Sequence, residues 1–408
     1  MPKPFSISTF FRMTPNVMLA EFFGRFETGV SPGDWDGIKE TEVEPLLNRL
    51  ADINDESVKN QIEKAIHDIA SLASKDGMAA FHEAALTCNQ PDWLNDLPKK
   101  GRYPTSMYVW LRYPKLFESA LAIFRFSGLT YWRRRAHLPL LAPKFTDEKL
   151  LQLKNSLENF FEERQGRGRV CTVDLYERGN GMYYITAHPD DYVEDVLVHD
   201  DLESLNNQTL CKTFEVTLAY DSRRGYCDLC AKVPSSLKAD LEQLFLETIL
   251  EEKLPPYEQP PFDLAPLLRQ DFTLATASEF RITAFIHVLS LKWEHGAMAH
   301  KTTITDSPYR DVSEAFSPKY PIQDAWAEHV KFQFLFHGVD GGKDKSITFE
   351  ITEPFTCTLR NQPQEYLELA HKLLQKWGIE HENKTNTQEE AVRETCIPLG
   401  AQIPLHSK

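Results

Sequence analysis

The stretch Gly166-Arg-Gly-Arg-Val-Cys-Thr-Val-Asp-Leu-Tyr176 decides the fold, because the spacing of apolar residues changes there from a helical period to strict alternation. Residues that alternate in this way point to opposite faces of a β-strand. Gly179-Asn-Gly181 follows as a hairpin turn signal, and residues 183–187 are the expected return strand. Residues 192–213 are expected to form a polar connection. The stretch therefore predicts the start of an antiparallel sheet.

A second hairpin and a helix complete this predicted module. Residues 214–233 alternate around the turn Asp221-Ser-Arg-Arg-Gly225, and residues 235–250 are amphipathic with a helical period. The same order of hairpin, connection, hairpin and closing helix recurs in residues 272–379. No residue-level repeat accompanies it, so the pattern leaves open whether the two modules are a true duplication.

The regions around these modules have other signatures. Residues before 166 carry apolar side chains at helical spacing, and Pro114 predicts a break or a kink in one of these helices. A proline-rich segment is expected to be a stiff linker packed on the surface. The sequence thus predicts an α+β fold with the following parts: a helical domain 1–165, an α+β module 166–253, a Pro-rich linker 254–271, a second α+β module 272–379 and a flexible tail 380–408.

Composition restricts the possible functions. The 408 residues include 42% hydrophobic and 26% charged residues, as in ordinary globular proteins. A formal charge of −15 argues against broad coating of DNA. No apolar run approaches the roughly 18 residues of a membrane span, and no secretory signal is evident. Seven irregularly spaced cysteines fit reduced thiols. We therefore expect a cytoplasmic protein without membrane contact or cofactor.

One motif suggests a metal site. Ala187-His-Pro-Asp-Asp191 resembles a segment of the zinc-dependent deacetylases that act on N-acetylglucosaminyl lipids and related sugars. The resemblance implies that His188 and Asp191 would bind zinc and that Asp190 would be the general base. Tyr192 stands where that family has Glu, and no downstream histidine pair has the expected spacing. A β-turn after an edge strand is the other interpretation, because Pro-Asp-Asp is common in turns.

A cysteine pair suggests a second chemistry. Cys227-Asp-Leu-Cys230 has the spacing of zinc sites and of thioredoxin-type redox sites. It lies inside a predicted strand, where residues three apart point to opposite faces. No second pair follows to complete a zinc site. We therefore expect two ordinary thiols.

Clusters of arginines are the remaining candidates for binding. Arginine forks beside an aromatic ring suit phosphate and base contacts, and glycines let a backbone approach a ligand closely. Gly166 and Gly168 flank one cluster. In the other interpretation, the arginines pair with carboxylates and stabilise the contact between domains. The candidate binding residues are Trp132, Arg133, Arg134, Arg135, Arg167 and Arg169.

A set of landmarks spread over most of the chain resembles a group of uncharacterised bacterial proteins carried in variable genome regions. The landmarks are Met13-Thr-Pro-Asn-Val-Met-Leu19, Asp34-Trp-Asp36, Tyr131-Trp-Arg-Arg-Arg135, Gly166-Arg-Gly-Arg-Val-Cys171, residues 214–250 and Leu374-Gln-Lys-Trp-Gly-Ile379. This resemblance implies no activity and no catalytic residue.

No complete catalytic constellation accompanies these features. The sequence therefore favours a non-enzymatic recognition or assembly component of the bacterial cytoplasm. Its partner would be a protein, another copy of the chain or nucleic acid, bound near the junction of the helical and β regions. The alternative is a metal-dependent hydrolase that uses the segment from His188 to Asp191.

Overall fold

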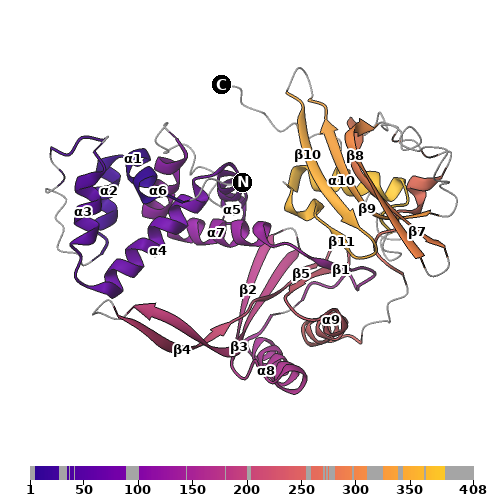
Figure 1. Cartoon of the computed structure of the whole chain (residues 1–408), viewed down its shortest axis with the longest axis horizontal. Helices are drawn as coiled ribbons and strands as arrows, with labels where there is room; N and C mark the ends of the chain where they lie inside the picture. The colour runs from indigo at the N-terminus through magenta and orange to yellow at the C-terminus, as the bar shows by residue number, and fades with distance from the viewer. Residues whose placement is uncertain are drawn as a thin grey trace. The chain divides into compact units, whose positions relative to one another are not determined.

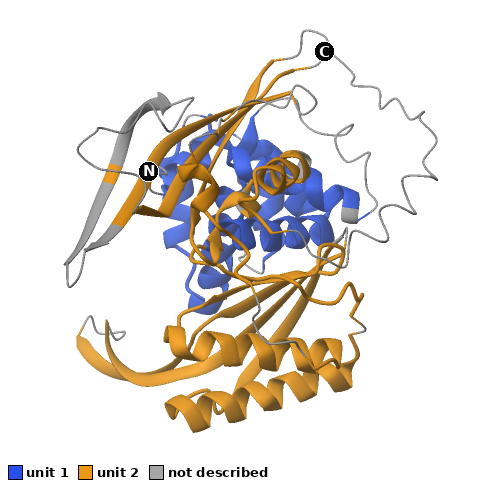
Figure 2. Cartoon of the chain, turned by 90° about the vertical axis from the view of Figure 1, so that its right-hand side faces the viewer, with its two compact units in different colours: residues 1–129 blue, residues 130–408 orange. Residues whose placement is uncertain are grey.

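The structure is a computed structural model, and it divides the chain into two compact units, Met1–Leu129 and Thr130–Lys408 (Figure 2). The residues that the structure describes are 5–26, 35, 37–40, 42–88, 101–143, 145–179, 181–199, 204–253, 259–269, 272, 274, 281–295, 298–309, 325–338, 343–362 and 364–381. Most of the expected tail, residues 382–408, lies outside this set.

The first unit is helical, as its apolar spacing predicts. Its helices are α1 (Ile7–Met13), α2 (Asn16–Phe23), α3 (Glu44–Ala51), α4 (Glu56–Leu72), α5 (Lys75–Thr87), α6 (Arg102–Arg112) and α7 (Pro114–Gly128). The side chains of Ser6, Asp55 and Ser74 each cap a helix by accepting a backbone N–H. Of the break or kink predicted at Pro114, the structure has a break, because α6 ends before this proline and α7 begins at it.

The boundary between the units falls at Leu129, earlier than the predicted end of the helical domain at residue 165. Helix α8 (Asp147–Gln165) belongs to the second unit. Its Leu157 and Phe161 are buried in one core with Ile185 of the first sheet. A helical period identifies α8 as a helix but not the element against which it packs.

The first sheet of the second unit is antiparallel throughout, with the order β1-β6-β5-β3-β2, and β4 pairs with β3 outside this path. Its strands are β1 (Arg133–Arg135), β2 (Cys171–Gly179), β3 (Met182–His199), β4 (Leu205–Thr213), β5 (Val216–Asp221) and β6 (Tyr226–Ala231). Helices α8 and α9 (Ser235–Leu250) pack side by side on one face of this sheet (Figures 1 and 2).

Strand β3 is long enough to have two environments. Its inner part, Met182–Ala187, lies between β2 and β5, whereas its outer part, Asp190–His199, pairs with β4. Strands β4 and β5 follow one another along the same edge of β3, with an irregularity between Asp190 and Val193. The three strands therefore form one extended hairpin that continues past the rest of the sheet (Figure 1). The expected polar connection at residues 192–213 is wrong, because most of these residues are strand.

The second sheet is also antiparallel and has the order β11-β10-β9-β7-β8. Helix α10 (Gln364–Lys376) packs on it, and Leu373 and Leu374 are among the fully buried residues of their shared core. Its strands are β7 (Ile282–His295), β8 (Met298–Tyr309), β9 (Ala325–Phe336), β10 (Lys345–Thr352) and β11 (Thr356–Cys357), and two 3-10 helices in this part of the chain are η3 (Ala265–Leu268) and η7 (Leu359–Asn361).

The proline-rich segment differs from the surface linker that its composition suggests. Phe262, Leu264 and Leu267 are almost completely buried in the core of the second sheet. The prolines restrict the backbone, but they do not prevent the apolar side chains between them from packing inward. Glu380, at the start of the expected tail, is also buried and forms a bridge with Phe262.

Seven helices without strands in the first unit and two antiparallel sheets with packed helices in the second confirm the α+β class, counting only elements within the described residues. In that part of the chain, none of the helices combines the length and the apolar character needed to cross a lipid bilayer.

Candidate functional site

The predicted arginine cluster at residues 133–135 is a strand in the interior of the second unit. Strand β1 pairs with β6, and Arg134 lies opposite Asp228 in the ladder. Arg134 and Arg135 are buried, and Arg133 is largely buried with its Nε donating to Glu242 over 3.0 Å. Glu242 is itself completely buried in α9.

Asp228 is the centre of this charged group. Arg134 donates to both of its carboxylate oxygens, over 2.8 and 3.2 Å, and Arg360 donates to Oδ2 over 2.7 Å. Burial by itself raises the pKa of Asp228, but the charges of Arg134 and Arg360 outweigh burial and hold this pKa below its ordinary value. Asp228 is therefore ionised and fully engaged by its two partners at neutral pH.

The same group extends to the end of the described chain. Arg134 also pairs with Glu380 over 3.1 Å, and Glu380 lies 2.6 Å from Nδ1 of His371 on α10. We call Arg133, Arg134, Asp228, Arg360 and Glu380 the arginine seam. The seam joins the two sheets, because its members come from β1, β6, the η7 turn and the segment after α10.

Aromatic rings cover the guanidinium groups of the arginine seam. Arg134 lies 3.9 Å from the centre of the Tyr226 ring, and Arg360 lies 4.0 Å from that of Trp132. Trp132 is almost completely buried, at 3% exposure. These rings contribute cation–π attraction inside the protein. Trp132 and its neighbouring arginines therefore serve as internal supports, and they do not present a surface for phosphate.

The second predicted cluster divides into one internal and one exposed arginine. Arg167 donates to Asp191 over 2.6 Å and lies 3.8 Å from the centre of the Phe214 ring. Arg169 is exposed, and its nearest described carboxylate, Glu162, lies 3.6 Å away. Only Arg167 is held in place by several groups, so the two side chains do not act as a pair.

The glycines beside Arg167 have a structural cause. Gly166 ends α8 in the left-handed conformation, with φ of 67°. Gly168 has φ of 81°, and a Cβ atom there would lie 2.5 Å from Cβ of Phe161. The close approach that the sequence assigned to a ligand is therefore occupied by Phe161 of α8.

The histidine-proline-aspartate motif lies where β3 leaves the sheet. Pro189 accepts a backbone hydrogen bond from Phe214 over 3.0 Å, and the strand irregularity begins at Asp190. Asp191 is engaged by Arg167, and its pKa is below the ordinary value because the bonds from Arg167 and the Tyr192 backbone outweigh the effect of burial. β-Bulges bend strands and redirect them. The motif is therefore not a turn, and it redirects β3 outward.

The metal set proposed for this motif is not assembled. His188 lies 3.7 Å from Asp174 of β2, whereas Asp191 is bound by Arg167. Zinc requires three or four protein ligands around one point. Within the described residues, no group of three or more His, Cys, Asp or Glu side chains is placed to hold a metal ion.

The cysteine pair lies on β6, as the alternating pattern predicts. Cys227 is buried, and burial raises the pKa of its thiol well above the ordinary value. Cys230 is partly exposed, with its pKa also raised by burial, and its sulfur lies 3.2 Å from the carbonyl oxygen of Thr130. A raised pKa disfavours the thiolate, which is the reactive form. The pair therefore lacks the reactive thiolates of a redox site.

A different feature stands out as a candidate binding element. We call residues 190–199 of β3 together with 205–213 of β4 the β3–β4 arm. Val193, Leu197 and Leu205 in the β3–β4 arm are 65%, 68% and 61% exposed. Val193 lies opposite Cys211 and Leu197 opposite Asn207 in the strand register, which places these apolar side chains on one face. Figure 1 shows the β3–β4 arm as a two-stranded extension of the sheet.

The root of the β3–β4 arm is firmly attached. The hydroxyl of Tyr192 donates to the carbonyl of Gln165 over 2.7 Å, and Arg167 links Asp191 with Phe214. The junction that the sequence singled out at residues 166–169 therefore holds this root. Polar composition does not predict the β3–β4 arm itself, although the β-branched residues in Tyr192-Val-Glu-Asp-Val-Leu-Val198 are a signal for a strand.

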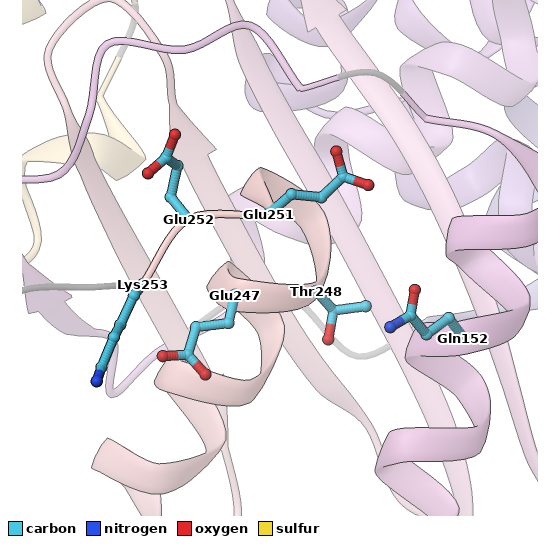
Figure 3. A pocket seen from close by; sticks show the side chains of 6 residues that line it. All are labelled: Gln152, Glu247, Thr248, Glu251, Glu252 and Lys253. Atoms are coloured by element: carbon cyan, nitrogen blue, oxygen red, sulfur yellow. The ribbon is translucent and has the colours of Figure 1, made fainter.

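A hollow of about 470 Å³ lies beside the C-terminal end of α9 (Figure 3). Glu247 and Glu251 come from this end, and Gln152 comes from α8. Glu251 is exposed and pairs with Lys149 over 3.1 Å. An open, acidic hollow of this kind is an ordinary solvated surface, so we assign no ligand to it.

Comparison with known proteins gives no match, either to a protein-family model or to a curated protein sequence. The resemblance to bacterial proteins from variable genome regions therefore stays a prediction. The geometry of the described residues is what supports a function.

Proposed function

We propose that this chain is a non-enzymatic recognition or assembly component that binds a protein partner through the β3–β4 arm. The observation that carries the proposal is the exposure of Val193, Leu197 and Leu205 on a strand pair that extends beyond its sheet. The cytoplasm is the proposed compartment, because the irregular cysteine spacing fits reduced thiols.

The energetics of a two-stranded ribbon support this role. An isolated pair of strands is only marginally stable in water, because it has no core of its own. Here β3 continues from the sheet into the strand pair, and Arg167 and Tyr192 anchor the pair at its root. An anchored element that keeps apolar side chains in water is suited to bury them against another molecule.

The charge of the β3–β4 arm selects protein over nucleic acid. Residues 190–199 contain four carboxylates, of which Asp191 pairs with Arg167 and Glu194 pairs with Lys212. Asp190 and Asp195 remain as a negative charge that would repel phosphate. The arginines of the arginine seam are paired inside the protein and do not compensate these charges. We therefore favour a protein partner.

The proposal is tested by site-specific photo-crosslinking in the cells that produce the protein. A photoreactive amino acid replaces Leu197, and the matched control carries it at Leu151 of α8, which is 55% exposed. We expect protein adducts from position 197 and none of the same composition from position 151. Mass spectrometry identifies the adducts, including those with a second copy of the chain.

Equal adduct patterns at the two positions, or none at position 197, would overturn the proposal. A folded control is also needed, because a failure of the protein to fold would remove the adducts for another reason. Circular dichroism and the unfolding midpoint of both labelled proteins should match those of the unmodified chain, since both side chains are exposed.

A further inference from the structure

We infer that the partner segment bound by the β3–β4 arm is an amphipathic α-helix that carries a lysine or arginine between two apolar residues. The helix lies on the face of the β3–β4 arm that presents Val193, Asp195 and Leu197. This inference rests on the proposed function, and it specifies the chemistry of the partner and the surface that binds it.

One face of the β3–β4 arm has apolar side chains on both sides of a carboxylate. Val193, Asp195 and Leu197 alternate along β3 with residues that point to the other side, so the three share one face. Thr209 of β4 lies opposite Asp195, and Leu205 is a diagonal neighbour of Leu197. All five side chains are exposed. We call these five residues the Asp195 face.

The carboxylate of Asp195 is held by a neutral group. The hydroxyl of Thr209 donates to its Oδ1 atom over 2.7 Å. Among the side chains that the structure describes, no lysine or arginine forms an ion pair with Asp195. By contrast, Glu194 on the opposite face of the arm pairs with Lys212. Asp195 therefore keeps its negative charge for a cation of another molecule, with its Oδ2 atom unoccupied in the described part of the chain.

The position of Asp195 determines the chemistry of a molecule that covers this face. A molecule that buries Val193 and Leu197 together must also remove water from the carboxylate between them. An ionised carboxylate is costly to remove from water unless a cation pairs with it. A lysine or arginine placed against Asp195 meets this requirement. The Asp195 face is therefore complementary to a partner whose cation has apolar side chains on both sides.

The same face favours a helix over an extended segment. The hydrogen bonds of a sheet lie in its plane, so a segment on the face of the β3–β4 arm receives none from the strands. An extended segment in that place has backbone N–H and C=O groups that lose water without gaining partners, which is unfavourable. An α-helix satisfies these groups within itself. A helix is therefore the segment best suited to cover Val193 and Leu197.

The spacing along β3 fits two turns of a helix. Val193 and Leu197 are separated by about 14 Å along the strand, with Asp195 at the midpoint. Two helical turns span about 11 Å, and long apolar side chains reach the remaining distance. The partner helix therefore needs two apolar residues about two turns apart, with a lysine or arginine about one turn from each.

Other occupants fit the Asp195 face less well. In a two-fold contact, a second copy would present the same face, and the two Asp195 carboxylates would share one interface. Phosphate groups of nucleic acids or anionic lipids are repelled by the same charge. For each of these occupants, removing the charge of Asp195 strengthens binding. For a cationic helix, the same change weakens it, so the sign of the effect identifies the occupant.

Selection from a bacteriophage-displayed library tests the inference on the purified full chain. The library presents one α-helix of a helical-hairpin scaffold with its exposed face randomised. Phage that also bind the Leu197→Asp chain are removed, which discards helices that are merely basic. We expect the remaining helices to carry apolar residues two turns apart with a lysine or arginine between them. Helices without a basic preference, or no helix that distinguishes the two chains, would overturn the inference.

Substitutions of Asp195 test the role of its charge. Fluorescence anisotropy measures the affinity of one selected helix for each chain. Asp195→Asn can still accept a hydrogen bond from Thr209, so it isolates the charge. We expect about fivefold weaker binding to Asp195→Asn and more than about tenfold weaker binding to Asp195→Lys. Glu177→Lys on β2 makes the same change in net charge and should leave the affinity nearly unchanged. Unchanged or tighter binding to Asp195→Asn would contradict a cationic partner.

A reciprocal substitution in the helix tests whether it lies against Asp195. A selected helix with glutamate in place of its basic residue should bind Asp195→Lys more tightly than the unmodified chain. Equal binding of this helix to both chains would show that its charged position does not face residue 195. Circular dichroism and the unfolding midpoint should match among the chains, because Asp195 and Glu177 are exposed.

Crosslinking from position 197 in cells separates this inference from the proposed function. A specific adduct whose crosslinked segment is helical, with a lysine or arginine between apolar residues, supports both. A specific adduct whose segment lacks this pattern, from another protein or from a second copy, overturns this inference and leaves the proposed function standing. The absence of specific adducts at position 197 overturns both.

Discussion

In the arginine seam and in the β3–β4 arm, side chains lie in environments that are the reverse of what their residue types suggest. Arg134 and Arg360 are charged, yet both are buried and share Asp228. Val193 and Leu197 are apolar, yet both are largely exposed on an alternating strand. Charge in the interior is balanced by partners, whereas apolar surface on the β3–β4 arm has no comparable compensation within the described chain.

This difference distinguishes groups that support the fold from groups that are suited to bind another molecule. A buried charge that is fully paired has its hydrogen-bonding partners within the protein, so it offers little to a ligand. Exposed apolar side chains on an anchored ribbon keep a free energy that burial against another molecule would release, about 25 cal/mol per Å² of buried apolar area. The β3–β4 arm is therefore a better candidate for binding than the arginine seam.

The largest expected effect comes from removing the centre of the arginine seam. Asp228→Ala leaves Arg134 and Arg360 buried without their shared carboxylate, which should lower the free energy of unfolding by about 3–5 kcal/mol. Urea denaturation combined with hydrogen exchange of β5 and β6 measures this loss. The control Lys212→Ala breaks the exposed pair with Glu194 and should cost less than about 1 kcal/mol. Similar losses for the two variants would contradict an essential role of the arginine seam.

The next effect concerns the junction at the root of the β3–β4 arm. Gly168→Ala combines an unfavourable positive φ with overlap against Phe161, and should cost about 2–4 kcal/mol. Gly166→Ala is the matched control, because a Cβ atom there meets nothing within 4 Å. It should cost only the backbone strain, about 1–2 kcal/mol. Thermal unfolding of the two variants measures the difference, and equal costs would refute a packing role for Gly168.

Acid should weaken the arginine seam. Burial raises the pKa of Glu380, but His371 and Arg134 outweigh it, so the pKa values of Glu380 and Asp228 are both below their ordinary values. A carboxylate with a lowered folded-state pKa stabilises the fold above its unfolded-state pKa, and this contribution is lost as the pH falls through the folded-state value. We expect the loss below about pH 4.

Denaturant titrations at several pH values measure this dependence. The stability difference between the unmodified protein and Asp228→Asn should shrink as the pH falls, because protonation removes the same charge that the substitution removes. A difference that stays constant down to the acid transition would show that Asp228 contributes no pH dependence.

The smallest effect is expected on the β3–β4 arm. Leu197→Ala should change the free energy of unfolding by less than about 0.5 kcal/mol, because the side chain is already in water. Ile185→Ala, on the inner part of the same strand, removes a completely buried side chain and should cost about 2–5 kcal/mol. If both cost the same in urea denaturation, the exposure of the β3–β4 arm would not describe the protein in solution.

Local patterns predicted much of the fold. The helical period before residue 166 and the alternation after it identified most elements, and Pro114 marked a true helix break. Turn residues such as those at 221–225 correctly separated β5 from β6. These features depend on residues close in sequence, because backbone hydrogen bonds and turn conformations are local.

The candidate site was harder to predict because its decisive contacts are distant in sequence. Asp190 and Asp191 had the residue types of a metal motif, but the strand irregularity and Arg167 determine what they do. The residues of β4 are mainly polar, and they form a strand only because β3 continues past the sheet. The polar composition therefore suggested an irregular connection at residues that form a strand by pairing with β3.

The sequence by itself determined the α+β class, the helical first part and two hairpins of the first sheet, β2–β3 and β5–β6. Tertiary structure alone decided that Arg134 is buried with Asp228 and Glu380, which are 94 and 246 residues away. It also decided that Val193 and Leu197 stay in water. The physical reason is that periodicity specifies which side chains share a face, whereas burial depends on what distant segments bring to that face.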